Sequence, residues 1–383
     1  MVNNILIITS QTYPSAAGDG RSAFFLAQEL YKQGEKCDIL TLETDEEQII
    51  NHDYSILNPS IIKIAYHDKT LTGKITTRIH LFFFLIVHLK RYNTWLIYGK
   101  TLGNRIALIL GKITRKKTIF RPTLWEYDDL QTLTKGSLFN KYTYRLSTGF
   151  WSLNPSITET ILKIGIEQNR IFESPQGVSA VFSPPQPGEK EKLRKKLNIP
   201  NDKTIITMVG HAIKRKGFPA VFNLFEDIDN FYLIVVGTNN PSPNERLFPY
   251  YEEMQTITNI GQRLIGPNIQ FTGKIENVSE YLKASDIFLH ASTREGFPPN
   301  SLNEAMSVGL PCLVKKIVGI PQRDYSNVIM VYNNEKDFKA NINLLIRNNQ
   351  QRNELSLNAA DFSRRHLDLK IIANNLVAFI NSI

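Results

Sequence analysis

The sequence predicts an α/β protein made of two Rossmann-like domains, each a parallel sheet flanked by helices, with a cleft between them. Three observations lead to this expectation. Short apolar runs rich in β-branched residues alternate with helical patterns. A stretch rich in proline and glycine interrupts the alternation near the middle of the chain, and the alternation then restarts. The 383 residues also exceed one domain of about 150 residues.

The first half of the chain supplies five predicted strands. They are Ile5 to Thr9, Cys37 to Leu42, Ile61 to Ala65, Trp95 to Tyr98 and Thr118 to Phe120. A helix is predicted over Ser22 to Gln33, because Ala23, Ala27, Leu30 and Tyr31 fall on a common face. Gly34 directly after it is typical of a helix C-terminal stop. Strands alternating with helices predict a parallel sheet that is covered on both faces.

The predicted second domain repeats this pattern. Its strands are Thr204 to Val209, Phe231 to Val236, Ile269 to Thr272 and Asp286 to His290, with a helix over Gly217 to Phe225. We expect an N-terminal acceptor-binding domain at 1–175, a linker region at 176–200, a donor domain at 201–365 and a C-terminal helix at 366–383 that packs back on the N-terminal domain. Near the end, Phe338, Ile342, Leu345 and Ile346 form an apolar helical stripe.

Composition narrows the class of protein. With 42% hydrophobic and 21% charged residues, the chain is typical of ordinary globular proteins. Only Cys37 and Cys312 occur, so a disulfide framework and a cysteine-based zinc motif are not expected. The start, Met1 to Ile8, lacks the basic region of a signal peptide, which predicts a cytoplasmic location. The net charge of +9 alone does not indicate a nucleic-acid partner, because no recognition motif accompanies it.

The positive charge is concentrated between Lys63 and Arg121, where 13 basic residues accompany one acid, Asp68. They surround the apolar run Leu81 to Leu89, which is far shorter than the roughly 20 residues of a transmembrane helix. Two interpretations stay open. The run is either a helix that lies on an anionic membrane surface with peripheral attachment, or a core helix with solvated ends.

The first candidate ligand site is the loop after the first strand. Gly18 and Gly20 belong to a G-x-G-x-x-A pattern, but eight residues separate it from the strand, which disfavours a dinucleotide role. Glycines at a helix start still let backbone N–H groups approach a phosphate. The alternative is a flexible connection in which Pro14 and Gly18 are turn residues.

The second candidate follows the strand that ends at Val209. Gly210 is followed by Lys214, Arg215 and Lys216, and Gly217 then opens a helix. Three adjacent cations at the positive end of a helix favour a polyphosphate, and they stabilise the negative charge of a departing diphosphate. The alternative is a solvated basic turn.

The third candidate is a loop with two carboxylates, Glu295 and Glu304. Between them lie Gly296, Phe297, Pro298, Asn300 and Ser301. Such carboxylates can bind sugar and ribose hydroxyls, while the N–H groups of the helix start face phosphate. The alternative is a capping box, in which Ser301 and Glu304 serve only the helix end.

In these residues the chain resembles the family 4 retaining glycosyltransferases of GT-B fold. The segment from Ile5 to Leu42 is similar to that family's opening strand, loop, helix and second strand. Ser174-Pro-Gln-Gly-Val-Ser179 resembles its interdomain signature. Gly210 to Gly217, Val236-Gly237, Phe271-Thr-Gly273 and Glu295 to Pro311 fall in the family's order. The resemblance covers nearly the whole chain.

The resemblance implies roles for these residues. Arg215 and Lys216 would hold the donor diphosphate, and Glu295 with the backbone of Gly296 to Pro298 would hold the transferred sugar. Glu304 would bind the ribose, and Lys274 and Ile275 would lie near the base. The implied catalytic residues are Glu295, Arg215 and Lys216, with a nucleoside-diphosphate sugar as donor substrate and neither a metal nor another cofactor.

Three departures from the family pattern stand out. Nine positions separate Glu295 from Glu304 where the family usually has eight, so one residue, such as Pro299, is inserted. His211 stands where many members have arginine. Arg121-Pro-Thr123 stands where a histidine often occurs, which leaves Asp128 and Asp129 as candidate bases or as a structural acidic pair.

The predicted function is a retaining glycosyltransferase that moves a sugar from its nucleotide donor to an envelope glycan or a lipid-linked acceptor. Two other classes remain open. A nucleotide-sugar 2-epimerase of GT-B fold would need no acceptor. A non-catalytic relative would bind a nucleotide sugar without consuming it.

Overall fold

The chain folds into two compact units. The computed structural model describes residues 2–10, 12, 18–43, 59–65, 70–124, 127–243, 245, 247–293, 298–316 and 325–383. The first unit takes in Met1–Gly177 and Leu369–Ile383. The second lies within Val178–Asp368. Each unit is described by itself below.

The first unit is built on a seven-stranded sheet in the order β3-β2-β1-β4-β5-β6-β7. All neighbouring strands pair in parallel. The strands are β1 (Asn4–Thr9), β2 (Lys36–Glu43), β3 (Ile61–Ala65), β4 (Thr94–Tyr98), β5 (Lys117–Arg121), β6 (Gly149–Ser152) and β7 (Ile171–Glu173). The central strands β1 and β4 are almost entirely buried, as apolar strands covered by helices on both faces must be.

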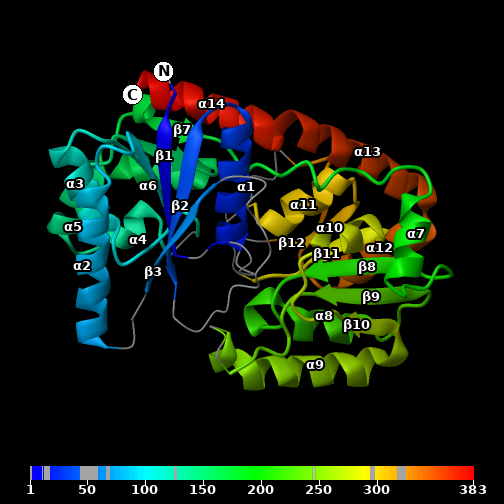
Figure 1. Cartoon of the computed structure of the whole chain (residues 1–383). Coiled ribbons are helices and arrows are strands. Elements are labelled where there is room, and N and C mark those ends of the chain that lie inside the picture. Colours follow the sequence, from blue (N-terminus) through cyan, green and yellow to red (C-terminus); the bar gives the residue numbers. More distant parts are fainter. Residues whose placement is uncertain are drawn as a thin grey trace. The chain divides into compact units, whose positions relative to one another are not determined.

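Seven helices accompany this sheet in the part of the unit that the structure describes. They are α1 (Gly18–Lys32), α2 (Leu71–Val87), α3 (Asn104–Ile113), α4 (Leu130–Thr134), α5 (Leu138–Arg145), α6 (Pro155–Lys163) and α14 (Leu369–Ser382), with a 3-10 turn, η2, at Gln168–Arg170. Helices α1 and α14 pack against each other on one side of the sheet, while α2, α3 and α5 lie along the other side (Figure 1). Right-handed crossovers in a parallel sheet require this division.

Two local details of the first unit bear on the predictions. Helix α1 ends where Gly34 takes a positive φ of 88°, as the predicted stop requires. It begins at Gly18, four residues earlier than predicted, because the glycine-bearing segment itself forms the first turn. The C-terminal helix α14 buries Leu376 and Ile380 in the core of this unit, and its Phe379 ring stacks on Phe172 of β7.

The second unit has a six-stranded sheet in the order β10-β9-β8-β11-β12-β13, again parallel throughout. The strands are β8 (Thr204–Val209), β9 (Phe231–Val236), β10 (Ile269–Phe271), β11 (Ile287–His290), β12 (Cys312–Lys315) and β13 (Ile329–Tyr332). The helices are α7 (Glu189–Lys196), α8 (Phe218–Leu224), α9 (Tyr251–Ile265), α10 (Val278–Lys283), α11 (Asn300–Val308), α12 (Glu335–Arg347) and α13 (Asn349–His366), with 3-10 turns η3 (Lys214–Lys216), η4 (Phe248–Tyr250) and η5 (Gly266–Asn268). The prediction of two α/β units with parallel sheets is therefore confirmed.

The stretch expected as a linker contains an ordered helix. Helix α7 is fastened to the second unit by Asp286, which accepts from the side chains of Lys190 at 2.5 Å and Arg194 at 2.6 Å. The same carboxylate accepts from the backbone N–H of Ile205 at 2.7 Å, so it joins α7 to β8. Cys37 and Cys312 are buried free thiols in different units, consistent with the expected lack of a disulfide between them.

Candidate functional site

The topology of the second unit defines where a ligand would bind. From β8 the chain proceeds through β9 to β10 on one side, whereas β11, β12 and β13 lie on the other. The loops after the neighbouring strands β8 and β11 therefore lead away in opposite directions. Open α/β sheets bind ligands in the crevice that such a switch point leaves at the carboxyl ends of the strands. The basic turn follows β8, and α11 follows β11.

The basic turn is a single 3-10 turn, η3, that two backbone hydrogen bonds close. The backbone N–H of Lys216 donates to the carbonyl oxygen of Ile213 at 3.0 Å, and that of Gly217 donates to Lys214 at 2.9 Å. Gly217 has a φ of 79°, and a methyl group at this position would lie 2.1 Å from the carbonyl oxygen of Ala291. The glycine is needed both for the left-handed conformation and for this close approach.

The same turn is bonded to the end of β11. The backbone N–H of Thr293 donates to the carbonyl oxygen of Arg215 at 3.0 Å, and the Thr293 hydroxyl reaches the same oxygen at 3.3 Å. The loops on the two sides of the switch point are thus held together. Three predicted site residues that follow Thr293 in the chain, Glu295, Gly296 and Phe297, lie outside the residues that the structure describes.

Glycines bring the loops after β8, β9 and β10 together. The N–H of Gly210 donates to the carbonyl oxygen of Val236 at 2.8 Å, and Gly237 forms an isolated bridge with Gly273. A methyl group on Gly237, which has a φ of 142°, would lie 2.3 Å from the carbonyl oxygen of Gly210. One on Gly210 would lie 3.1 Å from Cδ of Lys216, so the lysine stem covers the end of β8.

His211 lies among the predicted donor cations. Burial lowers the pKa of its imidazole to about 4, and the charges of Lys216, Arg215 and Lys274 act in the same direction. Its Nδ1 is buried and has no hydrogen-bond partner within the described residues. A neutral imidazole surrounded by three cations marks a region of positive potential, as an anion-binding site requires.

Lys274 and Ile275 follow β10, as predicted. The ammonium of Lys274 pairs with Glu245 at 3.2 Å, and Ile275 is half-buried. The structure therefore brings Gly210, Arg215, Lys216 and Lys274 to one end of one sheet. It does so although 64 positions separate Gly210 from Lys274 in the chain.

Helix α11 presents the remaining described candidates. Asn300 and Ser301 are half-buried in its first turn, and Glu304 is buried one turn further on. The N-cap is Pro299, with φ −66° and ψ 144°, and its side chain makes no capping hydrogen bond. The capping-box alternative is thereby excluded, since Ser301 lies inside the helix. Pro298, which directly precedes the N-cap residue, is buried.

The first unit shows what its candidate residues do locally. Gly18 and Gly20 lie in the first turn of α1, beyond the carboxyl end of β1. The carboxylate of Asp128 accepts from the backbone N–H groups of Thr123 at 2.8 Å and Leu124 at 2.7 Å. Burial raises the pKa of Asp128. Asp129 caps α4 by accepting from Thr132, so both carboxylates are buried and structural rather than a solvated pair.

Arg121 stands where the family often has histidine, and it is 2% exposed. Its guanidinium lies over the rings of Tyr98 at 4.2 Å and Trp151 at 4.9 Å, and it donates to Gln176. Planar guanidinium groups favour such stacked positions. Arg121 therefore ties β5 to the end of the first unit through the glutamine of the Ser174 to Ser179 signature.

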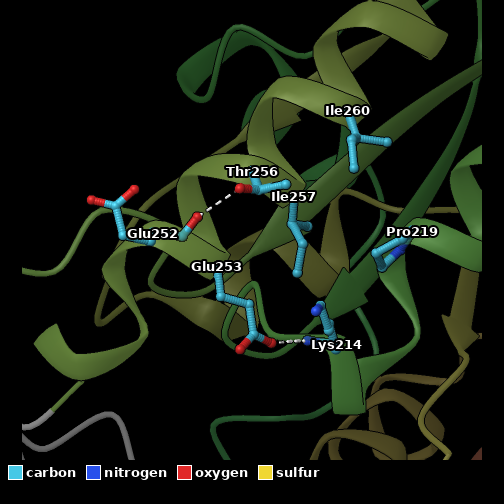
Figure 2. A pocket seen from close by; sticks show the side chains of 7 residues that line it. All are labelled: Lys214, Pro219, Glu252, Glu253, Thr256, Ile257 and Ile260. Carbon is cyan, nitrogen blue, oxygen red and sulfur yellow. Dashed lines mark hydrogen bonds between the residues drawn. The ribbon is translucent and has the colours of Figure 1, made fainter.

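A hollow of about 390 Å³ borders the basic turn on the side of α9. Figure 2 shows Glu253 of α9 reaching the backbone of Lys214, whose N–H donates to it at 2.5 Å. Neither Arg215 nor Lys216 lines this hollow, so it is separate from the predicted diphosphate site. The sequence did not predict Glu253 or Thr293 as supports of the turn, because 39 and 78 positions separate them from the residues that they hold.

Comparisons with known proteins show similarity to glycosyltransferases. Residues 189–362 match the family model of the glycosyl transferases group 1, and the match includes every described candidate of the second unit. An uncharacterized glycosyltransferase of Methanocaldococcus jannaschii is 26% identical over 193 residues, 48% of this chain and 45% of the relative. The N,N'-diacetylbacillosaminyl-diphospho-undecaprenol alpha-1,3-N-acetylgalactosaminyltransferase of Campylobacter jejuni is 26% identical over 243 residues, 61% of this chain and 60% of the relative. The chain thus spans about half the length of the curated relatives it matches.

The solved structures show the fold. The HepE protein of Anabaena, in complex with UDP and glucose, is similar over 100% of both chains, with a TM-score of 0.75 and 16% sequence identity. The chain has the GT-B fold, and it resembles the GT-B glycosyltransferases in both sequence and structure. The resemblance stated from the sequence is confirmed.

Proposed function

We propose that the protein is a retaining glycosyltransferase that moves a hexose from a nucleoside-diphosphate sugar to an envelope glycan or lipid-linked acceptor. One observation carries the proposal: Arg215 and Lys216 follow β8 and Lys274 follows β10, on loops that lie beside the switch point of the second sheet, and all three charges lower the pKa of His211. A site of this charge and place suits a diphosphate. The group 1 match over the same residues and the UDP in the HepE structure support this choice of ligand.

In the proposed reaction, the bond between the anomeric carbon and the diphosphate oxygen breaks, and the acceptor oxygen bonds to that carbon on the same face. The acceptor proton passes to the departing phosphate. Arg215 and Lys216 offset the negative charge that grows on the leaving group, so the step uses no metal and no further cofactor. Glu295 with Gly296 to Pro298 holds the sugar, Glu304 the ribose, and Lys274 with Ile275 the base.

The acceptor part of the proposal rests on the relatives. The Campylobacter jejuni relative is named for an undecaprenol diphosphate acceptor, which is a membrane lipid. We therefore place the reaction at the cytoplasmic face of the membrane, with the first unit binding the acceptor. No helix in the described part of the chain combines the length and hydropathy needed to cross a bilayer.

The test uses purified protein, a panel of nucleotide sugars and a membrane lipid extract, and it follows release of free nucleoside diphosphate. Release that depends on the extract supports transfer, and the product's anomeric configuration tests retention. Isomerisation of the donor sugar without an acceptor would instead indicate an epimerase. Binding without consumption in any extract would indicate a non-catalytic protein.

A double variant tests the site itself. Arg215→Ala with Lys216→Ala removes two charges and should abolish donor binding, measured by calorimetry, while circular dichroism stays unchanged. The matched control is Lys192→Ala with Lys195→Ala, which removes two exposed cations from α7 in the same unit. Equal donor affinity in both double variants would contradict the proposed site.

A further inference from the structure

Helix α2 exposes an apolar face to solvent. Its buried residues are Gly73, Thr77, Leu81 and Leu85, which form a single stripe with a spacing of four. The opposite side of the helix carries Ile75, Ile79, Phe82, Phe83 and Ile86, with exposed fractions of 45, 47, 39, 58 and 38%. We call these five residues the outer face of α2. An amphipathic helix in a water-soluble unit normally has polar residues in these positions.

This exposure contradicts the interpretation of the apolar run as a core helix. A core helix would bury residues on most of its circumference, whereas α2 buries only the stripe that meets α3 and β3. Five neighbouring large apolar side chains on one helix form a contiguous patch rather than the scattered exposure of ordinary surfaces. Helix α2 itself lies on the same side of the first sheet as α3 and α5 (Figure 1).

The surroundings of the outer face are strongly basic. Residues 70–124 contain 11 lysines and arginines and not one aspartate or glutamate. Lys74 and Arg78 are half-buried on α2, where the guanidinium of Arg78 donates to the carbonyl oxygen of Leu102 at 3.4 Å, and Lys90 is exposed just beyond the end of the helix. Long basic side chains at the margin of an apolar face can reach anionic headgroups while the apolar residues enter the acyl region.

The positive charge around the outer face indicates which partner binds it. A second copy of the chain in a two-fold dimer would place the same basic region against itself, and like charges would repel. A bilayer that contains anionic lipid offsets these charges, with about a fivefold gain in partitioning for each cation near the surface. The helix also has the composition of interfacial helices, with phenylalanine and isoleucine on one face and cations at its edges.

We propose that α2 docks the first unit on an anionic lipid bilayer through its outer face. The biological role of this docking rests on the proposed function. Docking would bring the acceptor-binding unit to a lipid-linked acceptor. Vesicle binding by itself requires neither donor nor acceptor. It is therefore measured independently of sugar transfer.

The experiment is cosedimentation of the full chain with vesicles, either of equal parts phosphatidylglycerol and phosphatidylcholine or of phosphatidylcholine alone. The wild type should pellet with the anionic vesicles and lose binding as salt is added. Phe82→Ser with Phe83→Ser should lower partitioning at least tenfold, since two large apolar groups no longer enter the bilayer. Lys74→Gln with Lys90→Gln should lower it by about 25-fold, from about fivefold per cation.

The matched control removes similarly exposed apolar side chains from the second unit. Phe248→Ser with Leu357→Ser alters residues that are 39% and 71% exposed, and it should pellet like the wild type. Calorimetry with UDP, without vesicles, checks that each variant keeps its donor site. The Arg215→Ala and Lys216→Ala variant should still bind vesicles, so failure of the donor site and failure of docking are separable.

Three results would overturn the inference. The first is a wild type that stays in solution with anionic vesicles, and the second is a Phe82 and Phe83 variant that pellets as well as the wild type. The third is a dimer in light scattering that the same variant converts to a monomer, because the outer face would then be covered by a second copy.

Discussion

The backbone N–H of Thr293 donates to the carbonyl oxygen of Arg215 at 3.0 Å, so the loop after β11 holds the middle of the basic turn. The bond fixes the backbone of a residue whose side chain is proposed to bind diphosphate. Directly beside it, Gly217 packs against the carbonyl group of Ala291. Positioning of the cations therefore depends on contacts made by backbone groups, which a preorganised anion site requires.

Gly217→Ala should destabilise the second unit by about 3 kcal/mol, because a positive φ and a clash with backbone act together. The matched control is Gly188→Ala, at φ 76° against 79°, where an added methyl group meets nothing within 4 Å. That change should cost only about 1 kcal/mol of strain. Calorimetric unfolding measures both, and equal losses would show that the contact with Ala291 is unimportant.

Glu253→Ala should weaken donor binding by about 5- to 30-fold, because Lys214 loses a charge-assisted hydrogen bond worth about 1–2 kcal/mol and the turn loosens. The effect should appear in donor KM more than in kcat, since Glu253 touches only the turn. Glu252→Ala is the control: this exposed neighbour contributes its backbone oxygen to Thr256, and the substitution keeps that group. Equal KM values for the two variants would refute a positioning role.

The sequence predicted most of the second unit because its signals are local. Gly210, the three cations and Gly217 follow a strand in the chain, and a parallel sheet must bring the ends of its strands to one edge. The prediction was less complete where distant residues decide the structure. Glu253 and Thr293 act through single hydrogen bonds across the fold, and no local pattern marks such partners.

Two features of the sequence have alternative interpretations that only the three-dimensional structure distinguishes. The run from Leu81 to Leu89 is equally apolar in a core helix and in a surface helix, and only the burial of α2 distinguishes them. The pair Asp128 and Asp129 was a candidate base in the sequence. In the structure each carboxylate accepts from nearby backbone N–H groups. Acidic residues make such bonds in many local sequence contexts, so the sequence alone does not identify this role.

Asp128→Ala should destabilise the first unit by about 2–4 kcal/mol, because the N–H groups of Thr123 and Leu124 lose their acceptor in a buried place. Asp129→Ala should cost about 1 kcal/mol, the usual value of a helix N-cap. All three tryptophans, at positions 95, 125 and 151, belong to the first unit, so their fluorescence follows its unfolding in urea. A larger loss for Asp129 than for Asp128 would contradict the assigned roles.

His211 should report the charge of the donor site through its own titration. Its pKa is lowered to about 4, first by burial and then by Lys216, Arg215 and Lys274. Between this value and the ordinary 6.5, the unfolded chain binds a proton that the folded chain does not. Stability contributed by the neutral imidazole is therefore present above about pH 6.5 and is lost as the pH falls towards 4.

Nuclear magnetic resonance of the imidazole C–H groups measures this directly, and comparison with His211→Gln assigns the signal among the seven histidines. In the free protein the ring should stay neutral down to about pH 5. Adding UDP should raise its pKa, because the diphosphate offsets the neighbouring cations. The same shift should be absent in the Arg215→Ala and Lys216→Ala variant, which no longer holds the ligand. A His211 signal that titrates near 6.5, or a His211 pKa that does not change when UDP is added to the wild type, would contradict a diphosphate site at this position.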